Sequence, residues 1–235
     1  APGFPPDISE KGMTDFAGGR LEISQGGPYP KTIYETWATL DGGKTFHVRR
    51  SPSLSGFRPR SSFVDFDGDG LLDMVTESLL LTEGGWWDTA LRILGRRAVD
   101  SEISVYRQSG GGFDREPILK FRTRIGLSRP PLFNDLMYQR YLASELIDIT
   151  GDFNGDGWRD LLVCDRPDRL AVYLAGGYAY PAKPSAVIPI REGDHFIIAD
   201  VNGDGFSDVV IQAMQYLEGK RFEGCRVCFA MEDTP

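Results

Sequence analysis

A nine-residue acidic pattern occurs three times in this chain, and it sets the narrowest limits on the fold. The copies are DFDGDGLLD at 65–73, DFNGDGWRD at 152–160 and DVNGDGFSD at 200–208. Each copy has Asp or Asn at positions 1, 3, 5 and 9, and glycine at positions 4 and 6. A pattern of this length that recurs three times indicates repeated structural units, which bury their apolar faces against their neighbours.

The segments around these acidic loops predict β-strands. Runs rich in β-branched and aromatic residues flank the loops, such as SSFVDF and LLDMVT around the first copy. A second pattern, a strand that ends in a glycine-rich turn and an aromatic residue, occurs at 103–117 and 169–184, with weaker versions at 34–50 and 223–230. The units repeat at intervals of roughly 48 to 87 residues, within or above the period of propeller blades. We therefore expect an all-β fold.

The interval between the first two loops is too long for four strands, so we expect two short helical insertions there. The residues on one face of each helix would be Trp87, Leu91, Leu94 and Ala98 in 84–100, and Tyr138, Leu142 and Leu146 in 130–146, where Asn134 would cap the helix. The first insertion also carries Trp86, Arg92, Arg96 and Arg97. These residues indicate either a docking surface or an ordinary helix with a packed and a solvated face, and the second is the more frequent case.

The spacing of the acidic positions is typical of a calcium loop. Ca²⁺ takes six to eight oxygen ligands, so a short loop must turn several carboxylates and a carbonyl toward one point. Side chains at positions 1, 3, 5 and 9 and the backbone carbonyl at position 7 would supply these oxygens. We expect about three Ca²⁺ ions, held by Asp65, Asp67, Asp69, Leu71 and Asp73; by Asp152, Asn154, Asp156, Trp158 and Asp160; and by Asp200, Asn202, Asp204, Phe206 and Asp208.

The three predicted sites differ in charge and differ from an EF-hand. Asn at position 3 of the second and third copies keeps the oxygen and removes one charge, so these sites should bind calcium more weakly. An EF-hand needs a bidentate Glu at position 12, where this chain has Thr76, Val163 and Ile211. The predicted flanks are also strands rather than helices. We expect a structural ion that stabilises the folded state.

Composition excludes several classes of partner. The net charge is −8, and the three loops hold ten aspartates, so the rest of the chain carries +2. No basic, aromatic-interleaved patch occurs, and nucleic acid is not an expected partner. No apolar run reaches the roughly 18 residues that span a bilayer, and the first residues lack signal-peptide features, so we expect any signal peptide to be gone already. Three cysteines leave at least one thiol unpaired within the chain.

The three loops, together with the turns in VYRQSGGGF and VYLAGGY, resemble the FG-GAP or VCBS repeats of integrin-α-like β-propellers over about residues 34–230. The resemblance implies blades of four antiparallel strands with calcium between the first two strands, a non-catalytic role, and a secreted, periplasmic or cell-surface location. Such propellers commonly have about seven blades, so this chain would be a fragment, a small or open propeller, or one completed by another chain. The expected division is a partial blade at 1–60 and calcium blades at 61–147, 148–194 and 195–235.

We expect a calcium-stabilised extracellular module that binds a protein or a carbohydrate, as in adhesion, rather than an enzyme. His47 and His195 lie far apart in sequence, and no nucleophile elbow, phosphate loop or HExxH motif occurs. A glycosidase pair would have to come from residues such as Glu192 and Asp194. Two alternatives remain: an assembly subunit that completes a propeller with another chain, and an accessory domain of a carbohydrate-active enzyme.

Overall fold

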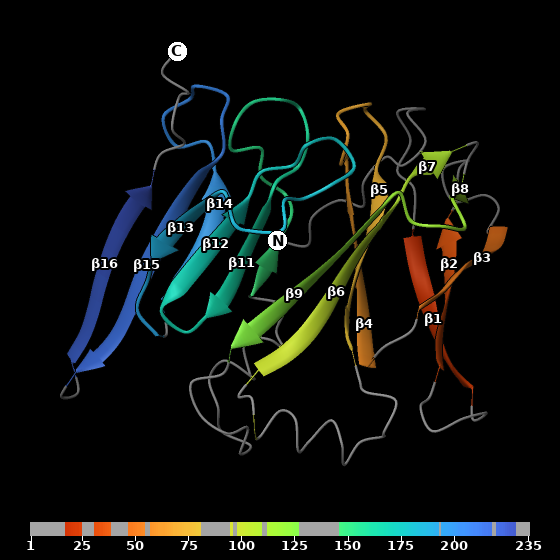
Figure 1. The fold of residues 1–235 in the computed structure, drawn as a ribbon, viewed down its shortest axis with the longest axis horizontal. Helices are drawn as coiled ribbons and strands as arrows, with labels where there is room; N and C mark the ends of the chain where they lie inside the picture. Colours follow the sequence, from red (N-terminus) through yellow and green to blue (C-terminus); the bar gives the residue numbers. More distant parts are fainter. Residues whose placement is uncertain are drawn as a thin grey trace. The chain divides into compact units, whose positions relative to one another are not determined.

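A computed structural model gives the fold of the chain (Figure 1). The residues it describes are 17–24, 31–38, 47–54, 57–80, 95, 98–109, 112–126, 146–192, 194–217 and 220–228. These residues form β-strands joined by turns and loops, so the predicted all-β class is confirmed. The chain divides into two compact units, which we call unit 1 (Ala1–Ala90 with Asp100–Arg122) and unit 2 (Leu91–Val99 with Thr123–Pro235).

Unit 1 contains most of two sheets and a small hairpin. The first sheet has the antiparallel order β1 (Ala17–Ser24), β2 (Lys31–Ala38), β3 (His47–Leu54). The second has the order β4 (Phe57–Val64), β5 (Asp73–Leu79), β6 (Ala98–Tyr106), β9 (Leu119–Gly126), and the hairpin joins β7 (Gln108–Ser109) to β8 (Gly112–Phe113). The first acidic loop connects β4 to β5, the first two strands of its sheet.

Unit 2 repeats this arrangement twice. One sheet has the antiparallel order β10 (Ile147–Asp148), β11 (Leu161–Arg166), β12 (Arg169–Tyr173), β13 (Ala186–Pro189). The other has the order β14 (His195–Ala199), β15 (Asp208–Leu217), β16 (Lys220–Cys228). The second and third acidic loops again connect the first two strands, so the predicted strand, loop, strand context is confirmed for all three copies. No sheet among the described residues closes on itself.

The core positions each loop through the strand that follows it, since the first residues of β5, β11 and β15 are buried. In unit 2, β11 buries every residue from Leu161 to Asp165, and β12 buries Leu170 to Tyr173. In unit 1, Met74 of β5 and Tyr106 of β6 form a buried cluster against which Phe63 and Phe113 pack. The rings of Phe63 and Phe113 lie 5.7 Å apart, so the β7–β8 hairpin is fixed beside the strand that leads into the first loop. Buried side chains therefore fix the end of each acidic loop, whereas β14, the strand before the third loop, has no buried residue.

The predicted helical insertions are tested at few positions. Gly95 is helical, but Ala98, predicted to lie on the same helix, is the first residue of β6. Burial at this end of β6 alternates as in a strand, with Val99 buried, Asp100 exposed and Ser101 buried. Leu146 is buried in a bend before β10. The other predicted face residues, with Trp86 and the three arginines, lie outside the described residues.

The described residues include all three cysteines. Cys164 is buried in β11, Cys225 is exposed and Cys228 is partly exposed, and no disulfide joins them. Within the part of the chain that the structure describes, no helix has both the length and the apolar character needed to cross a bilayer.

Candidate metal centres

The three acidic loops adopt one backbone conformation. In each, the glycines at positions 4 and 6 have positive φ, with values of 72° and 88° at Gly68 and Gly70, 71° and 86° at Gly155 and Gly157, and 78° and 90° at Gly203 and Gly205. Residues with a Cβ rarely adopt this region. The repeated glycines are therefore required by the turn, as the sequence predicted.

The alternating side chains fold the loop around themselves. The carboxylate or amide oxygen at positions 3 and 5 accepts a hydrogen bond from the backbone N–H two residues further on, a local contact typical of Asp and Asn in turns. The donors and acceptors are Asp69 N to Asp67 (3.3 Å), Leu71 N to Asp69 (2.9 Å), Asp156 N to Asn154 (3.4 Å), Trp158 N to Asp156 (2.8 Å), Asp204 N to Asn202 (3.1 Å) and Phe206 N to Asp204 (2.8 Å).

Position 1 closes the loop from the other side. Its carboxylate accepts the N–H of the glycine at position 6, from Gly70 to Asp65 at 3.2 Å, from Gly157 to Asp152 at 2.9 Å and from Gly205 to Asp200 at 3.0 Å. As a result, positions 1, 3 and 5 of each copy lie on one inner side of the turn. The predicted ligand residues at these positions are thus brought together in all three loops.

Position 9 differs from the other acidic positions because its carboxylate is completely buried. Asp73, Asp160 and Asp208 each have 0% exposure. Each accepts the backbone N–H at position 2 of its own loop, from Phe66 to Asp73 (3.3 Å), from Phe153 to Asp160 (2.6 Å) and from Val201 to Asp208 (3.0 Å). The carboxylate at this position therefore fixes the start of the loop to the start of the second strand.

The second oxygen of position 9 reaches the end of the third strand. Gln108 N, just after β6, donates to Asp73 at 2.8 Å, and Ala175 N, just after β12, donates to Asp160 at 2.7 Å. Burial raises the pKa of Asp73 and of Asp160 to about 6, although these hydrogen bonds act in the opposite direction. The sequence predicts the aspartate at this position as a calcium ligand, but only the structure shows that it lies between two backbone amides.

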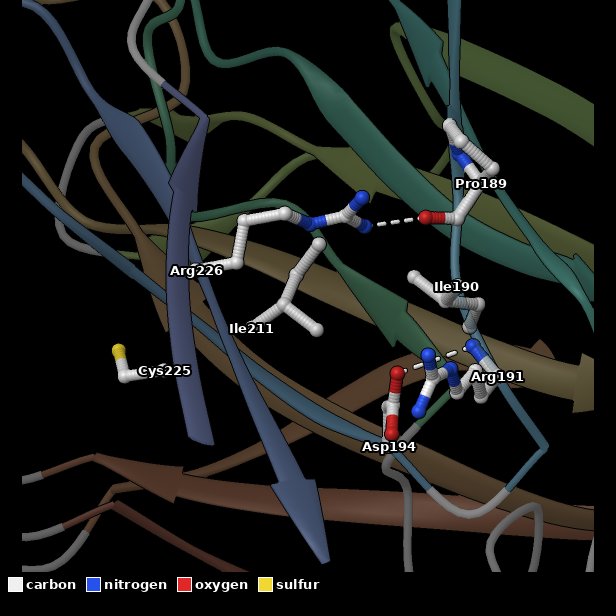
Figure 2. A pocket seen from close by; sticks show the side chains of 7 residues that line it. All are labelled: Pro189, Ile190, Arg191, Asp194, Ile211, Cys225 and Arg226. Atoms are coloured by element: carbon white, nitrogen blue, oxygen red, sulfur yellow. Dashed lines mark hydrogen bonds between the residues drawn. The ribbon is translucent and has the colours of Figure 1, made fainter. Parts of the chain in front are cut away.

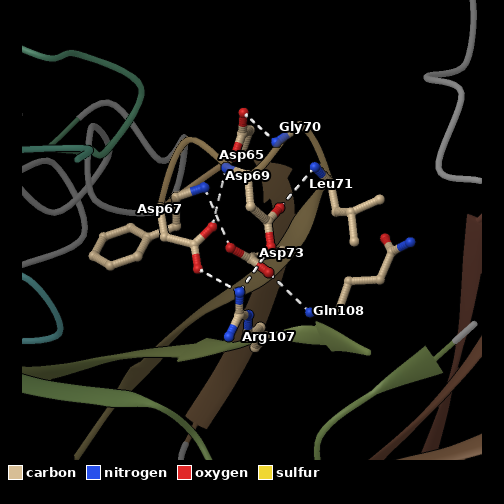
Figure 3. Close-up of polar contacts among 9 residues, drawn as sticks. Asp65, Asp67, Asp69, Gly70, Leu71, Asp73, Arg107 and Gln108 are labelled. Atoms are coloured by element: carbon tan, nitrogen blue, oxygen red, sulfur yellow. Dashed lines mark hydrogen bonds and ion pairs between the residues drawn. The ribbon is translucent and has the colours of Figure 1, made fainter. Parts of the chain in front are cut away.

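The first loop brings three carboxylates close enough to share one cation. Asp65, Asp67 and Asp69 each offer an oxygen, and these oxygens lie within 4.8 Å of one another (Figure 3). Two oxygens that bind one Ca²⁺ at 2.3–2.6 Å are at most about 5 Å apart, so the spacing fits. Carboxylate, amide and carbonyl oxygens are also the ligands that Ca²⁺ prefers. These three carboxylates therefore fit the predicted ion in both chemistry and separation, whereas Asp73, the predicted ligand at position 9, is not one of the group.

Arg107 is part of the first site, and the sequence analysis did not identify it. Its Nη2 lies 2.9 Å from Oδ2 of Asp69 and 3.2 Å from Oδ2 of Asp67 (Figure 3). Burial acts to raise the pKa of Asp69, but the hydrogen bond from Arg107 and the amide of Leu71 outweigh it, and the pKa is lowered. Arg107 follows β6, the third strand of this sheet, so the local pattern around the loop gives no signal for it.

The second loop is held by aromatic side chains. The ring of Trp158 meets the edge of Tyr178 with their centroids 4.8 Å apart. The hydroxyl of Tyr180 donates to the backbone carbonyl of Arg159 at 2.9 Å, and burial raises the pKa of this tyrosine. Both tyrosines belong to the glycine-rich turn predicted after β12, so this turn supports the loop.

The second and third loops of unit 2 contact each other directly. Ser207 N donates to the carbonyl of Asp152 at 2.7 Å, and Asp152 N donates to Oγ of Ser207 at 3.0 Å. The ring of Phe206 covers Gly155, where a Cβ would lie 2.1 Å from a ring carbon. Positions 7 and 8 of the third loop are thus packed on positions 1 and 4 of the second.

A pocket of about 400 Å³ lies elsewhere in unit 2, between the end of β13 and the strands β15 and β16 (Figure 2). Ile190 and Ile211 supply apolar walls, and Arg191 and Arg226 supply guanidinium groups. Arg226 donates to the carbonyl of Pro189, which connects β16 to β13. The pocket combines an apolar floor with positive charge.

Among the residues weighed as an enzymatic site, Asp194 has a local structural contact. Oδ2 of Asp194 accepts the N–H of Arg191 at 2.9 Å, and this carboxylate is buried in the turn before β14. Glu192 is exposed. His47 and His195 are the first residues of β3 and β14.

These features define an all-β protein of antiparallel strand units, three of which have an acidic loop between their first two strands. Residues 152–211 match the family model of the FG-GAP-like repeat. The match begins at position 1 of the second loop and ends in β15, so the predicted resemblance to this family is confirmed for this part of the chain. A comparison with curated proteins finds no match.

Proposed function

We propose that this chain is a non-catalytic, calcium-stabilised binding module of the extracellular or periplasmic space. The observation that carries the proposal is the geometry of the loops: all three share the turn with two positive-φ glycines, and in the first loop the oxygens of Asp65, Asp67 and Asp69 lie within 4.8 Å of one another. The match to the FG-GAP-like repeat supports the same class. Propeller-like arrangement of the strand units is part of this proposal.

Calcium would be held by positions 1, 3 and 5 of each loop, the backbone carbonyl at position 7 and the carboxylate at position 9. When bound, the ion supplies positive charge that offsets the repulsion among these carboxylates. The chain's own contribution is the turn, because the glycines and backbone amides hold the acidic side chains in place before the ion arrives. Such preorganisation reduces the ordering cost of binding.

Thermal unfolding with and without calcium tests the proposal. Three sites that bind the folded state should raise the unfolding free energy by RT ln(1 + [Ca²⁺]/Kd) each, about 2.7 kcal/mol per site at a hundredfold excess over Kd. We therefore expect a clear rise in the midpoint in millimolar calcium relative to excess chelator, with a smaller rise in magnesium. An unchanged midpoint, together with no calcium retained after gel filtration, would refute the calcium proposal.

The proposed ligand is a protein or a glycan. The pocket beside Arg191 and Arg226 would favour a ligand that carries a carboxylate or sulfate next to an apolar group. A glycan array that includes acidic sugars, compared for the wild type and Arg226→Ala, tests this with binding as the readout. Turnover of glycosides by the purified chain would instead contradict the non-catalytic role.

A second role, as an assembly subunit that completes a propeller with another chain, follows from the sheets of the described residues, which do not close. Edge strands need a partner or cover. Solution mass at several concentrations tests this role, because a strict monomer without partners argues against completion by a second copy. Copurification with one catalytic chain would favour the accessory domain of a carbohydrate-active enzyme.

A further inference from the structure

We infer that Arg107 is a tethered counter-cation of the first acidic loop, which balances the extra charge of Asp67 and lowers the calcium affinity of this site. The inference rests on the proposed calcium function and concerns the regulation of one of its sites. It contradicts the ranking that the sequence predicts, in which the loop with four aspartates binds calcium most tightly.

The first argument comes from the oxygen that Arg107 contacts. In the second and third loops, Oδ2 of the position 5 aspartate accepts a hydrogen bond from the amide nitrogen of the asparagine at position 3. The pairs are Asn154 Nδ2 to Asp156 at 3.0 Å and Asn202 Nδ2 to Asp204 at 2.7 Å. In the first loop position 3 is Asp67, which has no amide to donate. Nη2 of Arg107 donates to the corresponding Oδ2 of Asp69 at 2.9 Å and also contacts Asp67.

The second argument is charge. The second and third loops contain three aspartates each, and the first contains four. The guanidinium of Arg107 brings the first group back to the net charge of the other two. Asp67 has a side chain only 4% exposed, and Asp69 is 27% exposed, so solvent screens this group of charges incompletely.

The third argument is that the backbone fixes Arg107 at the site. Gln108 N donates to Asp73, and Ala175 N donates to Asp160, so Arg107 and Leu174 stand at equivalent places before these amides. The second loop therefore combines Asn at position 3 with Leu at the counter-cation place, and the first combines Asp with Arg. Within one chain, the two copies provide the pair of states that a substitution experiment needs.

The test converts the first site stepwise into the second. Arg107→Leu should tighten calcium binding at the first loop on the order of tenfold, because a dication then meets four carboxylates without a competing cation. Asp67→Asn should weaken binding by a similar factor. The double variant should return near the wild-type affinity, since it carries the residues of the second loop.

Site-specific readout comes from terbium luminescence, with Tb³⁺ as the calcium probe. Leu71→Trp places an indole at position 7 of the first loop, where the second loop has Trp158, and Trp158→Phe removes that second sensitiser. Calcium affinity is read by displacement of Tb³⁺ in this background. Arg122→Leu is the matched control. It removes an exposed arginine that forms an ion pair with Glu102 at 2.8 Å and lies away from the loop.

The thermal midpoint without calcium separates the counter-cation role from misfolding of the variants. Without calcium, Arg107→Leu should lower the thermal midpoint, and Arg107→Gln, whose amide can still donate to Asp69, should lower it less. Unchanged or weaker calcium binding in both folded variants would overturn the counter-cation role, while a wild type that binds no calcium would overturn the proposed function itself. Equal shifts for Arg122→Leu and Arg107→Leu would also overturn the inference, because net charge alone would then explain them.

Discussion

At the scale of single residues, two glycines of the same loop differ in the space that a side chain would have. Gly155 and Gly157 both lie in the second loop with positive φ, of 71° and 86°. A Cβ on Gly155 would collide with the Phe206 ring, whereas a Cβ on Gly157 would meet nothing within 4 Å. The turn explains both glycines, but contact with the neighbouring loop explains only the first.

Gly155→Ala should therefore destabilise the protein more than Gly157→Ala. The left-handed backbone alone costs a non-glycine residue about 1–2 kcal/mol, and the steric contact with Phe206 should bring the total for Gly155→Ala to roughly 2–5 kcal/mol. Chemical denaturation of both variants in calcium measures the difference. Gly203→Ala, the same loop position with open space around it, should behave like Gly157→Ala. Equal losses at all three positions would mean that Phe206 moves aside freely.

The residue scale also shows what a repeat pattern can predict. Positions 1, 3 and 5 and the glycines follow from local turn chemistry, which depends on neighbours in sequence, and these positions lie where the pattern predicted. Arg107 and Ser207 act on loops 38 and 55 residues away. Such partners are set by strand pairing and by packing between sheets, so a local pattern contains no information about them.

At the scale of elements, the second and third loops are hydrogen-bonded to each other in unit 2. Ser207 exchanges two hydrogen bonds with the backbone of Asp152, the first predicted ligand of the second site. Order in the third loop should therefore be transmitted to the second. Positive coupling between these two calcium sites follows if each ion orders the loop that holds it.

Ser207→Ala removes the hydroxyl that accepts the Asp152 amide, so it should cost about 1 kcal/mol of unfolding free energy and reduce the coupling between the two sites. Calcium titration by calorimetry should show a lower Hill coefficient, with the weaker of the two affinities shifted most. Ser185→Ala is the control, because Oγ of Ser185 accepts the Leu174 amide at 3.2 Å without joining the loops. A loss of coupling in both variants would trace the effect to general destabilisation.

Element boundaries could be predicted where one hydrophobic period continues along the sequence. The prediction failed where the period changes from 3.6 residues to two. The strands on either side of the acidic loops lie as predicted, although β11 is a continuous buried run from Leu161 to Asp165 rather than an alternating one. Ala98 fits a helical face by spacing, yet it starts β6, in which Val99, Asp100 and Ser101 are buried, exposed and buried in turn. The register with β5 ends at Ser101, so β6 continues beyond that partner. The two-residue period prevails over the 3.6-residue period here because this segment belongs to a sheet, which is a tertiary effect.

At the scale of the whole molecule, acidity and stability are linked through buried carboxylates in both units. The chain carries −8, and three dications would bring it to −2. Asp73 lies in unit 1 and Asp160 in unit 2, and burial raises both pKa values from 3.8 to about 6. Between these values the folded, ion-free protein holds protons that the unfolded chain releases.

The stability of the ion-free protein should therefore fall as pH rises from about 4 to about 6, because the unfolded state binds fewer protons over this window. Saturating calcium should reverse the sign, since the ion binds the charged carboxylates and acid displaces it. Urea denaturation of protein freed of calcium by chelation and gel filtration, repeated across this pH range with and without added calcium, measures both slopes. Asp160→Asn removes one titrating group and should flatten the ion-free slope, whereas an ion-free protein that gains stability with rising pH would contradict the raised pKa values of these two aspartates.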